Sequence, residues 1–197
     1  MIDNPKSSLI KIREILDGIV QTVRVLHRNK MVHRDLKPEN FMIDDAGSIH
    51  LIDFGTMKIA GIDEIDQSQT SGLPLGDLSY IAPETLIHGF ADARSDLFSI
   101  AAIVYEMLGK QLPFKPLTST SEIPKNLDRW RYKALNTLKD QNQDLPSWID
   151  GVLEKALSTN PENRYQAMSE FQHELNLPSN KILQSIERKP LLSLIHI

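Results

Sequence analysis

The N-terminal stretch of the chain carries the pattern of an amphipathic helix. Capping residues in the segment Asn4–Ser8 precede the pattern, and the polar segment Arg28–Lys30 would end it. Between them, apolar side chains recur at spacings of three and four residues, which places them on one helix face: Ile12, Ile15, Leu16, Ile19, Val23 and Leu26. We expect this face to pack in the core and to hold no functional site.

A second stretch is apolar on nearly every side. Ser95 and Asp96 favour the opening of a helix, and the pattern predicts that it runs to about Leu108. The helix should be central and buried, because its residues leave almost no polar face: Leu97, Phe98, Ile100, Ala101, Ile103, Val104, Met107 and Leu108. Further helices are predicted around 127–138, 146–157 and 165–175.

Two short strands are predicted between these helical stretches. Residues 41–44 and 48–52 have strand character, and Asp45-Ala46-Gly47 favours a tight turn between them. Such a hairpin would bring Asn40, just before the first strand, close to Asp53, just after the second. Residues 56–81 are polar and interrupted by glycine and proline, so they are expected to be irregular.

Composition narrows the class of protein. The 197 residues are 41% hydrophobic and 24% charged, which is ordinary for one soluble globular domain. A formal net charge of −4 without a basic run argues against nucleic acid or an anionic membrane as the main partner. Cysteine is absent, which excludes disulfides and cysteine-based zinc sites, and the six histidines lack paired metal-ligand spacing. No apolar run is long enough for a membrane segment and no signal peptide is visible, so the cytoplasm is the expected compartment.

Three short motifs point to a specific chemistry. Residues 33–40 read HRDLKPEN, residues 53–55 read DFG and residues 82–84 read APE. In this order and spacing, the chain resembles a eukaryotic-type protein kinase. The resemblance implies an α+β, mainly α fold: the large (C-terminal) lobe of a protein kinase, with a short β-hairpin at the active site.

The same resemblance assigns roles to the residues of these motifs. Asp35 would accept or orient the proton of the attacking hydroxyl, and Lys37 would contact the transferred phosphoryl group and favour Ser/Thr over Tyr substrates. Asn40 and Asp53 would bind Mg²⁺ through oxygen atoms and so hold ATP, with Met42 also in the nucleotide site. His33 would be a packed structural residue.

The segment from Thr56 to Ile81 corresponds to the activation segment of the family. Its candidate phosphorylation sites are Ser68, Thr70 and Ser71, although surface loops are in any case rich in Ser and Thr. Arg34 would pair with an added phosphate. Asp77 departs from the family, which usually has Thr after the preceding Gly. An acidic side chain there would pair with Lys37 or repel Asp35, which puts efficient catalysis in doubt.

Two further interactions implied by the family concern stability. Glu84 is expected to form a buried ion pair with Arg164. Asp96 is expected to bond to the backbone of the catalytic loop. A plain helix N-cap is the competing interpretation of Asp96, and the two roles are compatible.

Parts of a complete kinase are not found in this sequence. It has no glycine-rich phosphate loop and no V-A-I-K lysine, so residues 1–190 are interpreted as a partial kinase domain whose N-lobe is absent. We therefore expect the fragment to be inactive alone and to need that N-lobe as a partner. Residues 192–197 read as translated sequencing adapter, with a natural apolar tail as the alternative.

Three functions are compatible with these observations. The first is a bacterial Ser/Thr kinase acting on protein substrates, of a subgroup that also carries a phosphatase domain and a membrane anchor in the full-length protein. The second is a non-catalytic pseudokinase or interaction module, suggested by Asp77 and the absent lobe. The third is a small-molecule phosphotransferase, against which Lys37 and the pair of Glu84 with Arg164 argue.

Overall fold

The computed structural model describes residues 5–59, 78–114, 138, 145, 146 and 148–176. Its elements, in chain order, are α1 (Pro5–Arg28), β1 (Met31–Val32), the 3₁₀ turn η1 (Pro38–Asn40), β2 (Phe41–Ile43), β3 (Ile49–Leu51), β4 (Lys58–Ile59), α2 (Pro83–His88), α3 (Ala93–Gly109), α6 (Trp148–Ala156), η3 (Pro161–Asn163) and α7 (Met168–Asn176). The described part is mainly helical with two small two-stranded sheets, in agreement with the mainly α expectation. No helix within it is long and apolar enough to cross a membrane.

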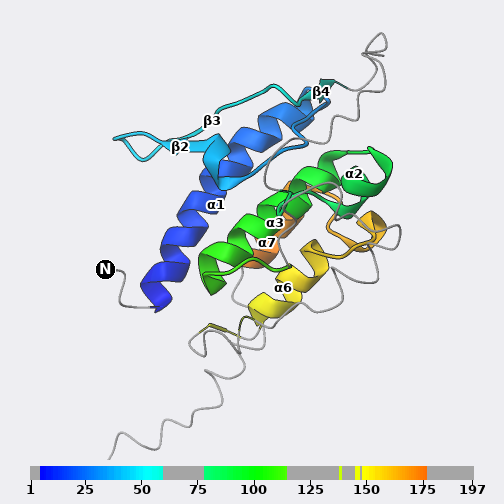
Figure 1. Ribbon diagram of the computed structural model, residues 1–197. Helices are drawn as coiled ribbons and strands as arrows, with labels where there is room; N and C mark the ends of the chain where they lie inside the picture. The colour runs from blue at the N-terminus through cyan, green and yellow to red at the C-terminus, as the bar shows by residue number, and fades with distance from the viewer. Residues whose placement is uncertain (1–4, 60–77, 115–137, 139–144, 147, 177–197) are drawn as a thin grey trace, which may run out of the picture.

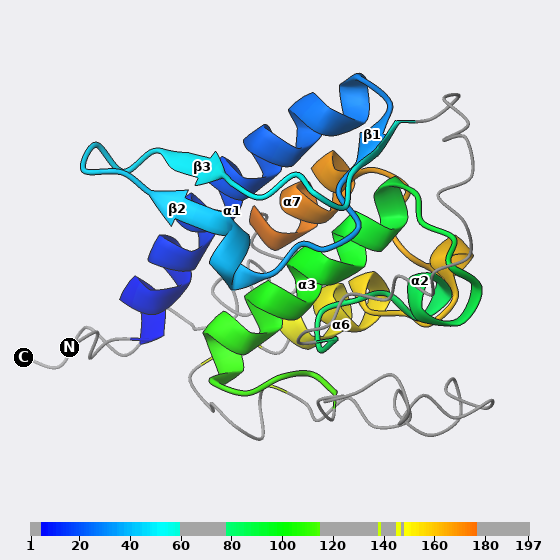
Figure 2. The same ribbon diagram turned by 45° about the horizontal axis from the view of Figure 1, so that its top comes forward.

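Helix α3 forms the centre of the molecule, as its all-apolar pattern predicted. Nearly all of its side chains are buried, and α1, α6 and α7 pack around it (Figures 1 and 2). Phe98 of α3 stacks on Phe114 at a centroid distance of 5.9 Å. Because the core surrounds α3, groups attached to this helix are held in fixed positions.

Helix α1 confirms the first amphipathic pattern. Its apolar face is buried against α3 and α7, and the helix ends at Arg28, within the predicted segment. The strand β3 lies across α1 at Gly18, where an added Cβ would stand 2.8 Å from Cγ1 of Ile49. A glycine in the middle of this helix therefore allows the hairpin to approach closely.

The predicted hairpin is present, with each strand slightly shorter than expected. Strand β2 pairs with β3 in antiparallel register, with Phe41 opposite Leu51 and Ile43 opposite Ile49. The carboxylate of Asp44 accepts hydrogen bonds from the Ala46 and Ser48 amides at 2.9 and 2.8 Å, so the turn begins one residue early.

A second ladder, between β1 and β4, was not predicted. Met31 pairs with Ile59 and Val32 with Lys58. The expectation that residues 56–81 are wholly irregular was therefore wrong for 58 and 59. A strand of two residues is too short to show an alternation of apolar and polar positions. It can be recognised only by its pairing with a distant strand.

The start of α3 corrects one expectation. The helix begins at Ala93, and its N-cap is Asp92, which forms a capping box with Ser95. Asp96 lies one turn inside the helix, so its interpretation as an N-cap was wrong. The helices predicted around 146–157 and 165–175 are confirmed as α6 and α7, although α7 starts only at Met168. The helix predicted around 127–138 lies outside the described residues except for its last position.

Candidate functional site

The loop between β1 and η1 is attached to the central helix through Asp96. This carboxylate is fully buried and accepts hydrogen bonds from the amides of His33 and Arg34, at 3.0 and 2.9 Å. His27, in the last turn of α1, lies with its Nε2 2.8 Å from the same carboxylate. The predicted bond from Asp96 to the loop backbone is confirmed, and it fixes the loop to the most buried element of the fold.

Asp35 and Lys37 follow on this anchored loop. The Lys37 ammonium donates to Asp35 Oδ2 at 3.2 Å, and the Asp35 side chain is largely buried. Arg34, just before Asp35, has a φ of 76°, a left-handed conformation that is costly for a residue with a Cβ. Backbone strain of this kind persists only where surrounding bonds enforce it, and here Asp96 supplies one of them.

Asn40 and Asp53 are brought together by the hairpin. The Ile52 amide donates to the Asn40 carbonyl at 2.8 Å, which joins the start of β2 to the residue before Asp53. The Asn40 side chain is buried and its Nδ2 donates to the Ile52 carbonyl at 3.4 Å. Its Oδ1 is buried and has no hydrogen-bond partner within the described part of the chain.

The residues at this position fit a hard divalent cation. An unpaired buried amide oxygen costs free energy unless another group binds it, and an oxygen donor is what Mg²⁺ prefers. Asp53 is exposed, has a φ of 62°, and its Oδ1 accepts from the Gly55 amide at 3.3 Å, which leaves its other oxygen available. The described residues contain no group of three or more His, Cys, Asp or Glu side chains suited to a metal.

Met42 lies on β2 with its side chain 56% exposed. Three further large apolar side chains on or next to this hairpin are also exposed: Ile43, Ile52 and Phe54. The assignment of Met42 to a nucleotide site stays a prediction.

His33 is a packed residue, as the resemblance implied. It is fully buried, and its ring lies edge-on to Phe54 at a centroid distance of 6.2 Å. Burial lowers the pKa of His33, against an opposing effect of the Asp96 carboxylate. Its burial under the loop supports a packing role for His33.

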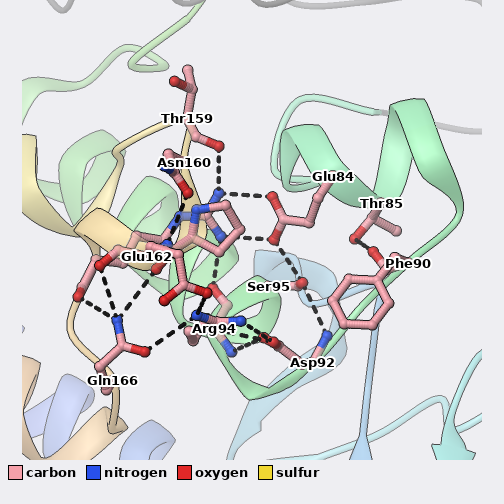
Figure 3. A network of polar contacts seen from close by, with 12 residues as sticks. Glu84, Thr85, Phe90, Asp92, Arg94, Ser95, Thr159, Asn160, Glu162 and Gln166 are labelled. Carbon is pink, nitrogen blue, oxygen red and sulfur yellow. Dashed lines mark hydrogen bonds and ion pairs between the residues drawn. The ribbon is translucent and has the colours of Figure 1, made fainter.

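The predicted ion pair between Glu84 and Arg164 is confirmed. Both side chains are buried, and the guanidinium of Arg164 binds both oxygens of Glu84 at 2.7 Å. Ser95 donates to Glu84 Oε1 at 2.7 Å, as Figure 3 shows, and Arg164 Nε donates to the Ser158 carbonyl. The pair and its hydrogen bonds join α2, α3 and the segments on both sides of η3.

Sequence reasoning missed a second layer of this network. Arg94 binds the carboxylates of Asp92 and Glu162, both at 2.7 Å, and the Gln166 side chain at 3.2 Å (Figure 3). These two carboxylates raise the pKa of Arg94. The signal for Asp92 was the capping box, an Asp followed three residues later by Ser at the start of an apolar run. Glu162 had no local signal.

Several predicted residues lie outside the described part of the chain. These are the candidate phosphorylation sites Ser68, Thr70 and Ser71, and the unusual Asp77. Arg34, their expected partner, is described, and its Nε is buried without a hydrogen-bond partner among the described residues. Its role in binding a phosphate stays a prediction.

Comparison with known proteins agrees with this geometry. The family model described as protein kinase domain matches residues 4–175. The serine/threonine-protein kinase PknB of Mycobacterium tuberculosis is 31% identical over 187 residues, covering 91% of this chain and 29% of the relative. PrkC of Bacillus subtilis is 28% identical over 87% of the chain, and PknL of Mycobacterium tuberculosis is 32% identical over 82%. The chain spans 25% of PrkC and 38% of PknL. It belongs to the protein kinase family.

Proposed function

We propose that this chain is the large lobe of a bacterial Ser/Thr protein kinase, which transfers the γ-phosphate of ATP to protein hydroxyl groups. The observation that carries the proposal is the buried Oδ1 of Asn40, which has no hydrogen-bond partner among the described residues. The Asn40 backbone is bonded to Ile52, the residue before the exposed Asp53. A buried amide oxygen without a partner is suited to a cation, because Mg²⁺ prefers oxygen donors. Here the oxygen is left for a ligand, next to the loop that carries Asp35 and Lys37.

In this proposal, each of the four motif side chains has its own role in the reaction. Asp35 accepts the proton of the substrate hydroxyl as its oxygen attacks the γ-phosphorus, and the bond to the β-phosphate oxygen breaks, which releases ADP. Lys37 neutralises charge on the transferred group and, at 3.2 Å, also holds the Asp35 carboxylate in place. Asn40 and Asp53 would hold Mg²⁺, which neutralises the phosphate oxygens when it is bound.

The exposed apolar side chains of Met42, Ile43, Ile52 and Phe54 support the assignment to a large lobe. Four large apolar side chains left exposed on and next to one hairpin are typical of a surface that a partner covers. We propose that a small lobe covers it and supplies the glycine-rich loop and strand lysine that this sequence lacks. Residues 1–190 would then be a partial kinase domain, inactive without that lobe. The adapter origin of residues 192–197, the cytoplasmic compartment and the phosphatase-containing subgroup stay predictions.

The test compares phosphotransfer by the full-length protein with that of its Asp35→Asn variant. Loss of the carboxylate should lower kcat on protein substrates by about 10²- to 10⁴-fold. Thermal unfolding of both forms provides the control for folding. Equal incorporation of label by both forms would exclude kinase catalysis and favour the interaction module. Transfer to small molecules, with none to protein, would favour the small-molecule phosphotransferase.

A further inference from the structure

Two segments carry the candidate site, and contacts of three kinds join them. The first segment, 33–40, contains Asp35, and the second, 53–57, contains Asp53. The strands β1 and β4 pair just outside them, and the rings of His33 and Phe54 touch. The hydroxyl of Thr56 donates to the His33 carbonyl at 2.9 Å.

The carbonyl that Thr56 binds belongs to the peptide unit between His33 and Arg34. The amide of the same unit, the Arg34 N–H, donates to Asp96 Oδ1 at 2.9 Å. A peptide unit is planar, so holding its oxygen and its hydrogen from two different elements fixes the orientation of the whole plane. That plane leads into Arg34, whose φ of 76° is strained, and then into Asp35. Thr56 and Asp96 together therefore determine how the chain enters Asp35.

The other end of this bond is part of the turn that follows Asp53. The Gly55 amide donates to Asp53 Oδ1 at 3.3 Å, and the Met57 amide donates to the Phe54 carbonyl at 3.3 Å, so residues 53–57 are closed on themselves. Thr56 is half-buried in this turn. A movement of the turn is thus transmitted to the peptide plane before Asp35, and the reverse also holds.

We propose that Thr56 is a positioning residue, whose hydroxyl sets the position of the metal-binding Asp53 relative to the proton acceptor Asp35. Thr56 acts through the His33–Arg34 peptide unit, to which its hydroxyl is hydrogen-bonded. The inference rests on the proposed function, because it concerns the relative position of the segments 33–40 and 53–57 of the proposed site.

The experiment uses the full-length protein and removes the hydroxyl at constant shape. Thr56→Val should lower kcat about tenfold, the loss expected for one hydrogen bond that aligns the reacting groups. It should also raise the Mg²⁺ concentration needed for half-maximal activity, with KM for the protein substrate unchanged. Thr56→Ser, which keeps the hydroxyl, should restore kcat to within about twofold of the parent. Should the valine variant fail to fold, Thr56→Ala against Thr56→Ser tests the same hydroxyl.

A matched control loses an equivalent bond away from the site. Thr85 is buried in α2 and its hydroxyl donates to the Phe90 carbonyl at 3.1 Å (Figure 3). Thr85→Val should leave kcat and the Mg²⁺ dependence unchanged.

A second readout does not depend on activity. Amide hydrogen exchange of the nucleotide-free protein should be faster at residues 33–35 and 53–57 in Thr56→Val, and not in Thr56→Ser or Thr85→Val. Unchanged exchange and kcat in Thr56→Val, or the same losses in Thr56→Ser, would overturn the inference. A parent protein without phosphotransfer would overturn the proposed function, while the exchange data would still decide whether Thr56 holds the two segments together.

Discussion

The cluster around Glu84 and Arg164 and the candidate site differ in how far their polar groups are hydrogen-bonded within the protein. In the cluster around Glu84 and Arg164, both carboxylate oxygens bind the guanidinium and Ser95 adds a further donor. At the candidate site, Asn40 leaves a buried oxygen unpartnered among the described residues, and Asp53 stands exposed. The first region contributes to stability, and the second leaves oxygen atoms that a ligand could bind.

The backbone shows the same contrast. Arg34 and Asp53, in the site, have φ values of 76° and 62°, whereas Glu84 and Arg94 lie in regular helices. Strain at Arg34 is held in place by Asp96, the one polar side chain of α3 that reaches the site loop through two backbone amides. The comparison indicates that the core, through Asp96, contributes to the position of the site loop together with the bonds within the site.

The largest effect is expected in the cluster around Glu84 and Arg164. Glu84→Ala leaves the guanidinium of Arg164 buried without a counter-charge and should lower the free energy of unfolding by about 3–5 kcal/mol. The control is Glu162→Ala, which removes a partner of Arg94. Because the Glu162 side chain is 73% exposed, this change should lower the free energy of unfolding by no more than about 1 kcal/mol. Urea denaturation measures both. Equal losses would show that burial does not separate the two pairs.

An intermediate effect is expected where the two regions meet, on α3. Asp96→Asn replaces one acceptor oxygen by a donor facing the amides of His33 and Arg34, and should cost about 1–3 kcal/mol and lower kcat. Asp92→Asn is the matched change at the N-cap, where asparagine is equally suited, and should cost less than about 1 kcal/mol. Denaturation and phosphotransfer assays of the full-length protein distinguish them. An Asp96→Asn variant with unchanged stability and unchanged kcat would contradict the role of Asp96 in holding the loop.

The smallest effect is expected where helix α1 packs against strand β3 of the hairpin. Gly151→Ala, in α6, meets open space and should stabilise the protein by about 0.5–1 kcal/mol. Gly18→Ala, in α1, brings a Cβ against Cγ1, Cδ1 and Cβ of Ile49 and should instead destabilise it by about 0–2 kcal/mol. Thermal unfolding of the two variants provides the comparison. An equal gain at Gly18 would mean that β3 moves freely on α1.

Much of this description was predictable, because the signals are local. The apolar spacing in α1, the apolar surface of α3 and the turn at Asp44–Ser48 each follow from neighbouring residues, as did the approach of Asn40 to the residue before Asp53. The pairing of Glu84 with Arg164 was anticipated through the family resemblance alone, since 80 residues separate them. The N-cap of α3 was misplaced because Ser95 and Asp96 are themselves capping residue types.

The sequence by itself therefore determined the helices α1, α3, α6 and α7, the hairpin and the identity of the chemical groups in the motifs, since periodicity and turn chemistry act over a few residues. The short helix α2 was not predicted. Only the tertiary structure decided which polar atoms complete their bonds. The two-residue ladder of β1 and β4, the peptide unit held between Thr56 and Asp96, and the network of Arg94 all join segments distant in the chain. Such contacts depend on how the core places its elements, and no local pattern encodes them.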